Sequence, residues 1–377
     1  MAGSIQDRGN GNYFLTVSNG FDSNGKRIRK TKTVKAKGIT EAREKLAAFV
    51  TEVKQGEYIA PSHIKLKDYA VIWKNERKKK IAPSTLETYN YVLDGRILKA
   101  IGHLKLEDIK PIHITNYVEE LEAEGLSSSS IMKNFEVLSS IFKLAIKNDV
   151  IKHNPLDKVD RPSITHKAGD VYNSDELKQL YHLLNKEGNK QMVLMIKLAL
   201  LTGMRKGEIL ALQWDDVDFT TNTIHIQHSL SYTKEYGYHL KEPKTKGSVR
   251  KVAPPRRFMD ELKKHVYVKK TERMEAAELW EGGEYYFVFS SDLGKPFHLD
   301  SPNRWWARFL KRTGFKKIRF HDLRHTAATN LINKNANIHS ISKRLGHSNI
   351  KTTMNIYGHY LEEADQKIAD MLDEDYI

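Results

Sequence analysis

Apolar and polar side chains alternate in short runs over the first sixty residues, as expected for strands that bury one face. The alternation predicts three strands, over Ser4–Gln6, Asn12–Val17 and Lys26–Val34. A helix capped by Thr40 follows them. Its apolar face, at helical spacing, is formed by Ala42, Leu46, Phe49 and Val53. Residues 1–60 are therefore predicted to form a small sheet backed by one helix.

Helical periodicity replaces this alternation from residue 64 onward. The apolar spacing predicts four amphipathic helices, over residues 66–79, 84–101, 109–124 and 128–148. The connections between them are short, which favours a compact bundle. Two linkers are predicted beside the bundle: residues 58–62 before it and the polar, non-periodic residues 160–170 after it. We therefore assign the bundle to a second domain, residues 64–160.

Both patterns occur in the rest of the chain, which we assign to a third domain, residues 171–377. Its first part predicts helices over Ser174–Asn185, Lys190–Leu201 and Arg205–Ala211. Short strands are predicted over Thr223–Leu230, His239–Lys241 and Val249–Val252, and mainly helix beyond them. The fold class is therefore multidomain and mainly α with small β-sheets (α+β): a sheet-and-helix module, a helical bundle and a mixed α/β domain.

Charge points to a polyanionic partner. Lysine and arginine number 62 against 47 acidic residues, a net charge of +15, so nucleic acid is the favoured partner. There is no apolar run of the length that spans a membrane, so no membrane association is expected. Cysteine is absent, which excludes disulfides, thiolate metal sites and cysteine nucleophiles and fits a cytoplasmic protein.

A dense basic cluster lies in the first domain and contains no acidic residue. It consists of Lys26, Arg27, Arg29, Lys30, Lys32, Lys35 and Lys37. Such a cluster can be a lysine-protected edge strand or a sheet face that lies against DNA phosphates. We favour DNA binding because of the density of the cluster.

Chemistry-bearing side chains gather in the third domain. Arg205 follows a helix break at Gly203, which places its guanidinium at the start of a new helix, with Glu208 three residues later as a partner or support. His321 and Arg324 have the spacing of neighbours on one helix face. An isolated arginine in such a position is usually a surface residue, and an isolated histidine is more often structural than catalytic.

Two further residues extend this group toward the C-terminus. His347 follows Leu345 and a capping glycine at a predicted helix end. Tyr357 lies ten residues later, with Tyr360 as a competitor. A tyrosine at helical spacing usually packs in a core, but here it accompanies two arginines and several histidines.

The set of Arg205, His321, Arg324, His347 and Tyr357, in their local contexts, resembles the tyrosine recombinase (phage integrase) family. The resemblance covers residues 174–360. The bundle resembles the core-binding domain of these enzymes, and residues 1–60 resemble the arm-binding domain of integrases. This N-terminal module favours integration and excision of a phage or mobile element over Xer-like chromosome resolution.

The resemblance implies a role for each residue. Tyr357 would be the nucleophile that forms a 3′-phosphotyrosyl link to DNA. Arg205 and Arg324 would stabilise the phosphate, His321 would act as a base and His347 would donate a hydrogen bond to it. The family's general acid, a lysine on a strand turn, matches Lys244 best, with Lys246 as its rival, and Glu208 would orient Arg205. The resemblance implies no metal, no other cofactor and no ATP.

The family also implies partners. These are double-stranded DNA at core and arm attachment sites and a homotetramer that passes through a Holliday junction, in a bacterial host cytoplasm. A directionality factor or a host DNA-bending protein can join them. The acidic tail, Leu361–Ile377, would dock on a neighbouring subunit or pack on its own domain. Two other classes share some of these features: a topoisomerase-like relaxing enzyme of type IB and a noncatalytic DNA-binding regulator.

Overall fold

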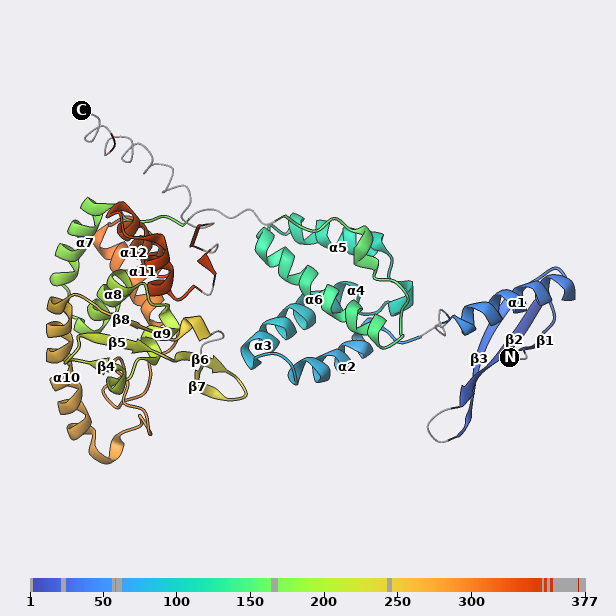
Figure 1. Ribbon diagram of the computed structural model, residues 1–377, viewed down its shortest axis with the longest axis horizontal. Coiled ribbons are helices and arrows are strands. Elements are labelled where there is room, and N and C mark those ends of the chain that lie inside the picture. Colours follow the sequence, from blue (N-terminus) through green and yellow to red (C-terminus); the bar gives the residue numbers. More distant parts are fainter. Residues whose placement is uncertain are drawn as a thin grey trace. The chain divides into compact units, whose positions relative to one another are not determined.

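The computed structural model describes residues 3–21, 25–55, 58, 63–163, 169–242, 246–347, 349–350, 353–354 and 372 of the chain. The chain divides into two compact units, Met1–His166 and Lys167–Ile377, which we call the N-terminal unit and the C-terminal unit (Figure 1). The N-terminal unit contains two hydrophobic clusters, one in its first sixty residues and one in the helical bundle, and the C-terminal unit has a large cluster of its own. Within the described ranges, no helix is both long and apolar enough to cross a membrane.

The N-terminal unit begins with a three-stranded antiparallel sheet in the order β1-β2-β3. Its strands are β1 (Gly3–Asp7), β2 (Asn12–Phe21) and β3 (Arg27–Lys35). Helix α1 (Ile39–Lys54) covers one face of this sheet (Figure 1). Leu15 and Val17 of β2 are fully buried beneath Phe49 of α1, so the alternation in the sequence does mark the core face.

The predicted Thr40 cap is wrong. Helix α1 begins at Ile39, so its N-cap is Gly38, and no side chain caps it. Instead, the Glu41 carboxylate accepts a hydrogen bond of 2.8 Å from the Lys37 backbone N–H. An acidic residue in the first turn also complements the positive end of the helix dipole, which stabilises this start without a cap.

The bundle follows in the same unit. Its helices are α2 (Leu66–Lys78), α3 (Pro83–Val92), α4 (Leu98–Ile101), α5 (Pro111–Ala123) and α6 (Ser128–Lys147). Trp73 of α2 is fully buried against α6, and its indole N–H donates to Ser140 Oγ at 2.9 Å. The helix predicted over residues 84–101 contains a π turn, Leu93–Ile97, between α3 and α4. Both Leu93 and Ile97 are fully buried.

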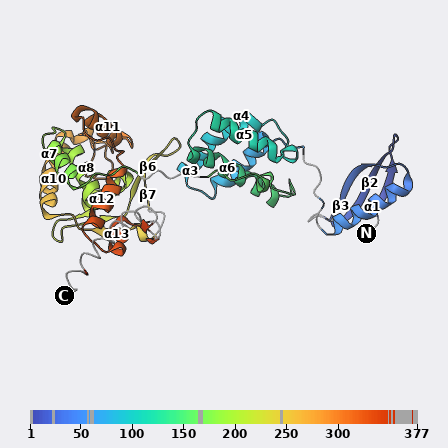
Figure 2. The same cartoon turned by 90° about the horizontal axis from the view of Figure 1, so that it is seen from above.

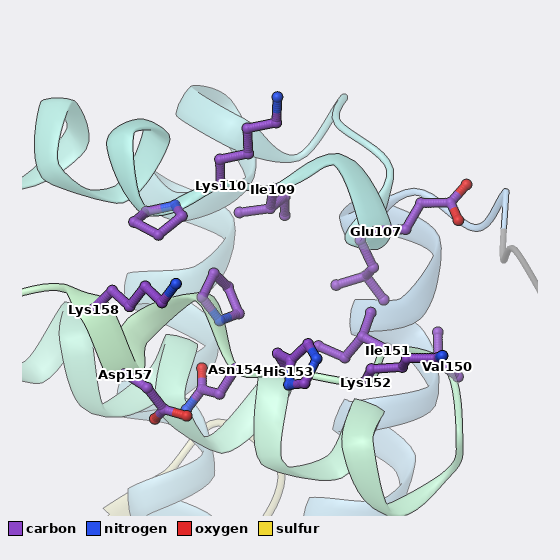
Figure 3. A pocket seen from close by; sticks show the side chains of 13 residues that line it. Glu107, Ile109, Lys110, Val150, Ile151, Lys152, His153, Asn154, Asp157 and Lys158 are labelled. Carbon is purple, nitrogen blue, oxygen red and sulfur yellow. The ribbon is translucent and has the colours of Figure 1, made fainter. Parts of the chain in front are cut away.

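A pocket of about 670 Å³ opens on the bundle (Figure 3). It lies between the segment Leu106–Pro111 and the segment Val150–Lys158. Figure 3 shows side chains of both charges around its mouth, among them Glu107, Lys110 and Lys158.

The C-terminal unit is built around α8 (Lys190–Thr202), whose residues from Met192 to Leu200 are all buried. The surrounding helices are α7 (Ser174–Asn185), α9 (Lys206–Ala211), α10 (Arg256–Ala276), α11 (Ser301–Thr313), α12 (Asp322–Asn333) and α13 (Ile338–Leu345). Figure 2 shows this unit from above, with α8 among its neighbours. The mainly helical fold with small sheets is the one predicted.

Two small sheets complete this unit. One has the order β4-β5-β8 and consists of β4 (Val217–Asp218), β5 (Thr223–Ile226) and β8 (Arg250–Val252). The other is a hairpin of β6 (Ser229–Thr233) and β7 (Gly237–Lys241). The strand predicted over Thr223–Leu230 is wrong as one element, because β5 and β6 belong to different sheets. Gln227 lies at the break and donates to Asp216 Oδ1 at 2.6 Å, a contact that alternation cannot reveal.

Candidate active site

The break between α8 and α9 places Arg205. Gly203 ends α8 with a left-handed φ of +67°, and Arg205 is the N-cap residue of α9. A Cβ at Gly203 would lie 2.4 Å from Leu345 Cδ2, so the break packs tightly against α13. Glycine therefore supplies both the backbone conformation and the close approach. The predicted position of Arg205 at the start of a helix is correct.

Glu208 holds Arg205 from behind. Its Oε1 accepts from Arg205 Nη1 at 2.8 Å, and its Oε2 accepts from the Arg205 backbone N–H at 2.9 Å. Burial raises the pKa of the Glu208 carboxyl, but hydrogen bonds and positive charge from Arg250 and Arg205 outweigh burial and lower it overall. Glu208 is therefore a carboxylate at neutral pH. The Arg205 side chain remains 39% exposed, so part of its guanidinium is accessible.

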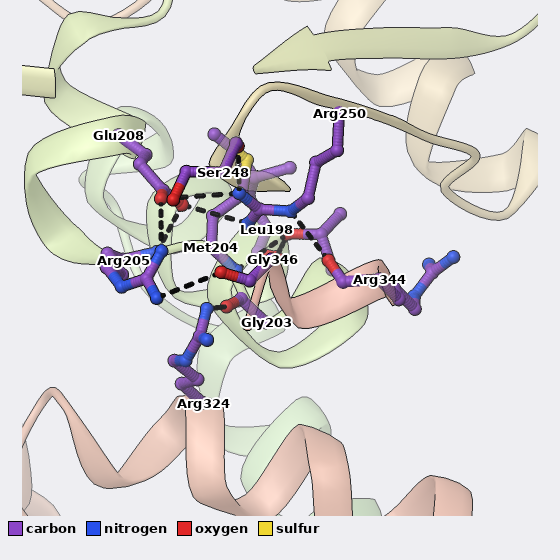
Figure 4. A network of polar contacts seen from close by, with 11 residues as sticks. Leu198, Gly203, Met204, Arg205, Glu208, Ser248, Arg250, Arg324, Arg344 and Gly346 are labelled. Carbon is purple, nitrogen blue, oxygen red and sulfur yellow. Dashed lines mark hydrogen bonds and ion pairs between the residues drawn. The ribbon is translucent and has the colours of Figure 1, made fainter. Parts of the chain in front are cut away.

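Arg324 approaches the same break from α12. It is 3% exposed, and its Nη1 donates to the Gly203 carbonyl oxygen at 2.5 Å. Because a buried guanidinium must be hydrogen-bonded, this contact fixes both the side chain and the packing of α12 on α8. Figure 4 shows Arg205 and Arg324 on adjacent sides of the Gly203 turn. The structure thus brings together two arginines that are 119 positions apart in the sequence.

His321 lies one turn before Arg324 and is the N-cap residue of α12. Its ring is edge-on to that of His325, with centroids 5.2 Å apart. Desolvation, followed by the charges of His325 and Arg324, lowers the pKa of His321 to about 4. The imidazole is therefore neutral at neutral pH, which is the form that can accept a proton.

His347 joins the cluster from the end of α13. It follows Gly346, which caps the helix with a φ of +69°, as the sequence predicted. The His347 Nδ1 and the Thr353 Oγ1 atoms are 2.8 Å apart. Burial lowers the pKa of His347 to about 4, with further contributions from the charges of Arg324 and Arg205. This imidazole is therefore neutral and sits in the positive field of both arginines.

Sequence reasoning missed two further arginines of this region. Arg250, on β8, contacts both oxygens of Glu208 (Figure 4). Arg344, on α13, donates to the Leu201 carbonyl oxygen at 2.9 Å. One signal could have revealed Arg250. It lies two positions before the buried Val252 on a short strand, so its side chain shares the core-facing side of that strand.

Several predicted residues lie outside the described residues: Lys244, Tyr357, Tyr360 and almost all of the tail Leu361–Ile377. The backbone of the rival lysine, Lys246, forms a 3₁₀ turn, Lys246–Ser248, directly before β8. In the part of the chain that the structure describes, no three histidine or acidic side chains are grouped as metal ligands are.

Fold and site together define a class of protein whose site is a cluster of arginine and histidine side chains suited to an anion. The model of the phage integrase family matches residues 171–364, and that of the phage integrase N-terminal SAM-like domain matches residues 65–122. The first match alone spans more than half of the chain, so the chain belongs to the phage integrase family, the tyrosine-type site-specific recombinases.

Individual relatives agree with this assignment. The chain is 28% identical to a tyrosine recombinase XerC-like protein of Caldanaerobacter subterraneus subsp. tengcongensis, over 97% of this chain and 96% of the relative. It is also 28% identical to the ICEBs1 integrase of Bacillus subtilis, over 98% and 99% of the two chains.

Solved structures share the fold. The Tn1549 transposon integrase in complex with a circular intermediate DNA superposes with a TM-score of 0.67 at 20% identity, over 78% of this chain and 95% of that one. The lambda integrase tetramer bound to a Holliday junction gives a TM-score of 0.57 at 18% identity, over 92% of each chain.

Proposed function

We propose that this chain cuts and rejoins duplex DNA at specific sites and thereby integrates and excises a phage or other mobile element. One observation carries the proposal: three separate segments bring Arg205, Arg324 and His347 together. Arg205 Nη2 donates to the Gly346 carbonyl, next to His347, and Arg324 Nη1 donates to the Gly203 carbonyl, two residues before Arg205. The charges of both arginines act on His347. Two guanidiniums and a neutral imidazole grouped in this way suit a phosphodiester, whose non-bridging oxygens accept hydrogen bonds.

The arginines stabilise the transition state. Attack on the scissile phosphate produces a pentacoordinate phosphorane with extra negative charge on its equatorial oxygens, where Arg205 and Arg324 donate. Arg324 is held at the Gly203 carbonyl and Arg205 at Glu208, so both donors are in place before the DNA arrives. His347 adds a neutral N–H donor to the same oxygens.

Proton transfers accompany the cleavage. The Tyr357 hydroxyl, with an ordinary pKa of about 10, gives its proton to neutral His321 as its oxygen attacks phosphorus. The bond from phosphorus to the 5′-oxygen breaks, and Lys244 (or its rival Lys246) gives that oxygen a proton. The products are a 3′-phosphotyrosyl link and a free 5′-hydroxyl. A 5′-hydroxyl from another strand reverses these steps, so the reaction needs neither ATP nor a metal.

The rest of the chain binds DNA. Residues 64–160 and 171–377 would clamp each core site, and residues 1–60 would bind arm sites. Four copies would act on two duplexes through a Holliday junction, with the tail docking between subunits or on its own domain. A directionality factor or a DNA-bending host protein would set the direction, in the bacterial cytoplasm.

The register of the N-terminal sheet divides its basic cluster between two faces. Lys32 is opposite the buried Leu15, on the side of α1, and pairs with Glu52 at 2.9 Å. Arg27, Arg29 and Lys35 are exposed and follow the opposite parity, so they belong to the open face. We assign the arm-site contact to this open face.

A covalent adduct tests the proposed function. Wild-type protein is mixed with a suicide substrate that carries a nick beside the scissile phosphate, and the protein–DNA adduct is detected by denaturing electrophoresis. Tyr357→Phe is expected to abolish the adduct, because it removes the attacking oxygen, whereas Tyr360→Phe retains it. An adduct that survives Tyr357→Phe refutes the nucleophile, and wild-type protein without any adduct refutes the function.

A further inference from the structure

Arg250 is a buried cation that the mechanism above does not use. It lies on β8, where it pairs with Ile226 of β5, and its side chain is only 6% exposed. Burying a guanidinium is unfavourable unless its donors are all directed at acceptors. The acceptors around Arg250 therefore show what this side chain holds in place.

Its first acceptor is Glu208, the carboxylate that orients Arg205. Arg250 Nη2 donates to Glu208 Oε2 at 2.9 Å, and its Nη1 donates to Oε1 at 3.3 Å. Each carboxylate oxygen thus accepts from both Arg250 and Arg205 (Figure 4). The negative charge of Glu208 is shared between one buried guanidinium and one that faces the phosphate.

Its second acceptor is the end of α13. Arg250 Nε donates to the Arg344 carbonyl oxygen at 2.7 Å, two residues before the Gly346 cap. A Cβ at Gly346 would lie 2.8 Å from Arg250 Nη1, so the cap rests directly on the guanidinium. The Gly346 carbonyl in turn accepts from Arg205 Nη2 at 3.3 Å, and His347 is the next residue.

Its third acceptor lies in the turn that contains Lys246, one of the two candidates for the general acid. Arg250 Nη1 donates to the Ser248 carbonyl oxygen at 3.1 Å, in the turn Lys246–Ser248. One guanidinium therefore links four segments: α9 with Arg205, the α13 cap before His347, the turn that contains Lys246, and β8 itself.

We propose that Arg250 is a positioning residue for strand cleavage. It neutralises the charge of Glu208 and holds the C-terminal end of α13 by hydrogen bonds, so that Arg205 and His347 contact the same phosphate. This proposal rests on the proposed function. Without Arg250, the buried Glu208 carboxylate would have Arg205 as its remaining strong counterion and would draw that guanidinium away from the phosphate. Arg250 itself, buried behind Glu208, does not touch DNA.

The test compares two scissile groups in single-turnover cleavage of the nicked substrate. One is the normal phosphodiester; the other is a methylphosphonate, in which a neutral methyl group replaces one anionic oxygen. The methylphosphonate places less charge in the transition state and so depends less on Arg205. Arg250→Ala is expected to slow phosphodiester cleavage about 100-fold, as loss of an oriented donor does, but methylphosphonate cleavage less than about 5-fold.

Two further variants separate positioning from folding. Arg250→Lys keeps the charge beside Glu208 but cannot fork onto three acceptors, so it is expected to fold and to show a smaller loss with the same substrate dependence. Glu208→Gln combined with Arg250→Ala should cleave faster than Arg250→Ala alone, because a neutral amide no longer captures Arg205.

Lys197→Ala is the matched control, since it removes a buried cation of α8 from its ion pair with Glu261 of α10. It is expected to affect both substrates equally. If the Arg250 variants also slow both substrates equally, or if the double variant shows no recovery, the proposal is overturned. Failure of the proposed function is distinct, because wild-type protein would then cleave neither substrate.

Discussion

Arg29, on the N-terminal sheet, and Arg324, in the C-terminal unit, carry the same guanidinium group in opposite surroundings. Arg29 is exposed on the open face of β3 and makes no ion pair within the described residues. Arg324 is buried and held by the Gly203 carbonyl. An exposed cation contributes charge that salt screens, whereas a fixed buried one contributes direction. The first arrangement suits affinity for DNA, and the second suits catalysis on one phosphate.

Replacing Arg324 by lysine is the strongest test of this contrast. Arg324→Lys keeps the charge but loses the planar fork, so we expect cleavage of bound DNA to fall by roughly 100- to 1,000-fold. Single-turnover cleavage and DNA affinity are measured on the same nicked substrate. Arg312→Lys, an exposed arginine on α11 paired with Glu187, is the control and should leave the rate unchanged. If Arg324→Lys weakened DNA binding as much as it slowed cleavage, Arg324 would not differ from an exposed arginine in this way.

Neutralising the open face of the sheet should have the reverse effect. A triple change of Arg27, Arg29 and Lys35 to glutamine is expected to weaken binding to arm-site DNA roughly 10- to 100-fold, and to reduce the slope of log affinity against log salt by about 3. Affinity is measured by titration at several salt concentrations. Cleavage of a nicked core substrate should not change.

The opposite face of the sheet supplies a matched control for that triple change. Lys32→Gln removes a cation that pairs with Glu52 beneath α1, so the salt slope should fall by less than about 1. If Lys32→Gln reduced the salt slope as much as each charge removed in the triple variant, the two faces of the sheet would not differ in DNA binding.

Buried groups should also make the stability of the two regions respond differently to pH. His265, on α10, is 5% exposed, donates a ring N–H to the Val288 carbonyl at 2.9 Å, and has a pKa lowered to about 4 by burial. Between pH 6.5 and 4, the unfolded state takes up a proton that the folded state does not. Stability should therefore fall by on the order of 3 kcal/mol as pH falls through this window.

His265→Gln isolates this effect, because the amide can still donate to the carbonyl but cannot be protonated. The free energy of unfolding of the C-terminal unit, measured by denaturant titration at pH 7, 5.5 and 4, should depend less on pH in the variant. His182→Gln, at an exposed position on α7, should leave the profile unchanged. The first sixty residues contain no histidine, so unfolding of the N-terminal sheet should lack this component.

Local signals in the sequence were sufficient to place several site residues. A glycine after an apolar helix predicted the breaks at Gly203 and Gly346, and therefore the positions of Arg205 and His347. Strand parity could also have divided the basic cluster, since Lys30 and Lys32 share the parity of the partly buried Val34. These features depend on neighbouring residues, so one stretch of sequence contains all the necessary information.

Contacts between distant segments could not be predicted in this way. Arg250 is 42 positions from Glu208 and 94 from Arg344, and no local pattern states that these groups meet. The break between β5 and β6 was missed for a similar reason, because the spacing of Ile224, Ile226 and Leu230 continues through it. The fold class could be predicted from periodicity, whereas the contacts that hold the site residues in place are visible only in the tertiary structure.

The π turn Leu93–Ile97 has a consequence for how this chain can change in length. A π turn is an α-helix with one residue inserted, so it stores a spare residue where insertion or loss leaves the flanking helices intact. Deleting Gly95 would join α3 and α4 into one continuous helix that still begins at Pro83. The bundle thus contains a place where single-codon deletions can be tolerated inside a helix rather than in a loop.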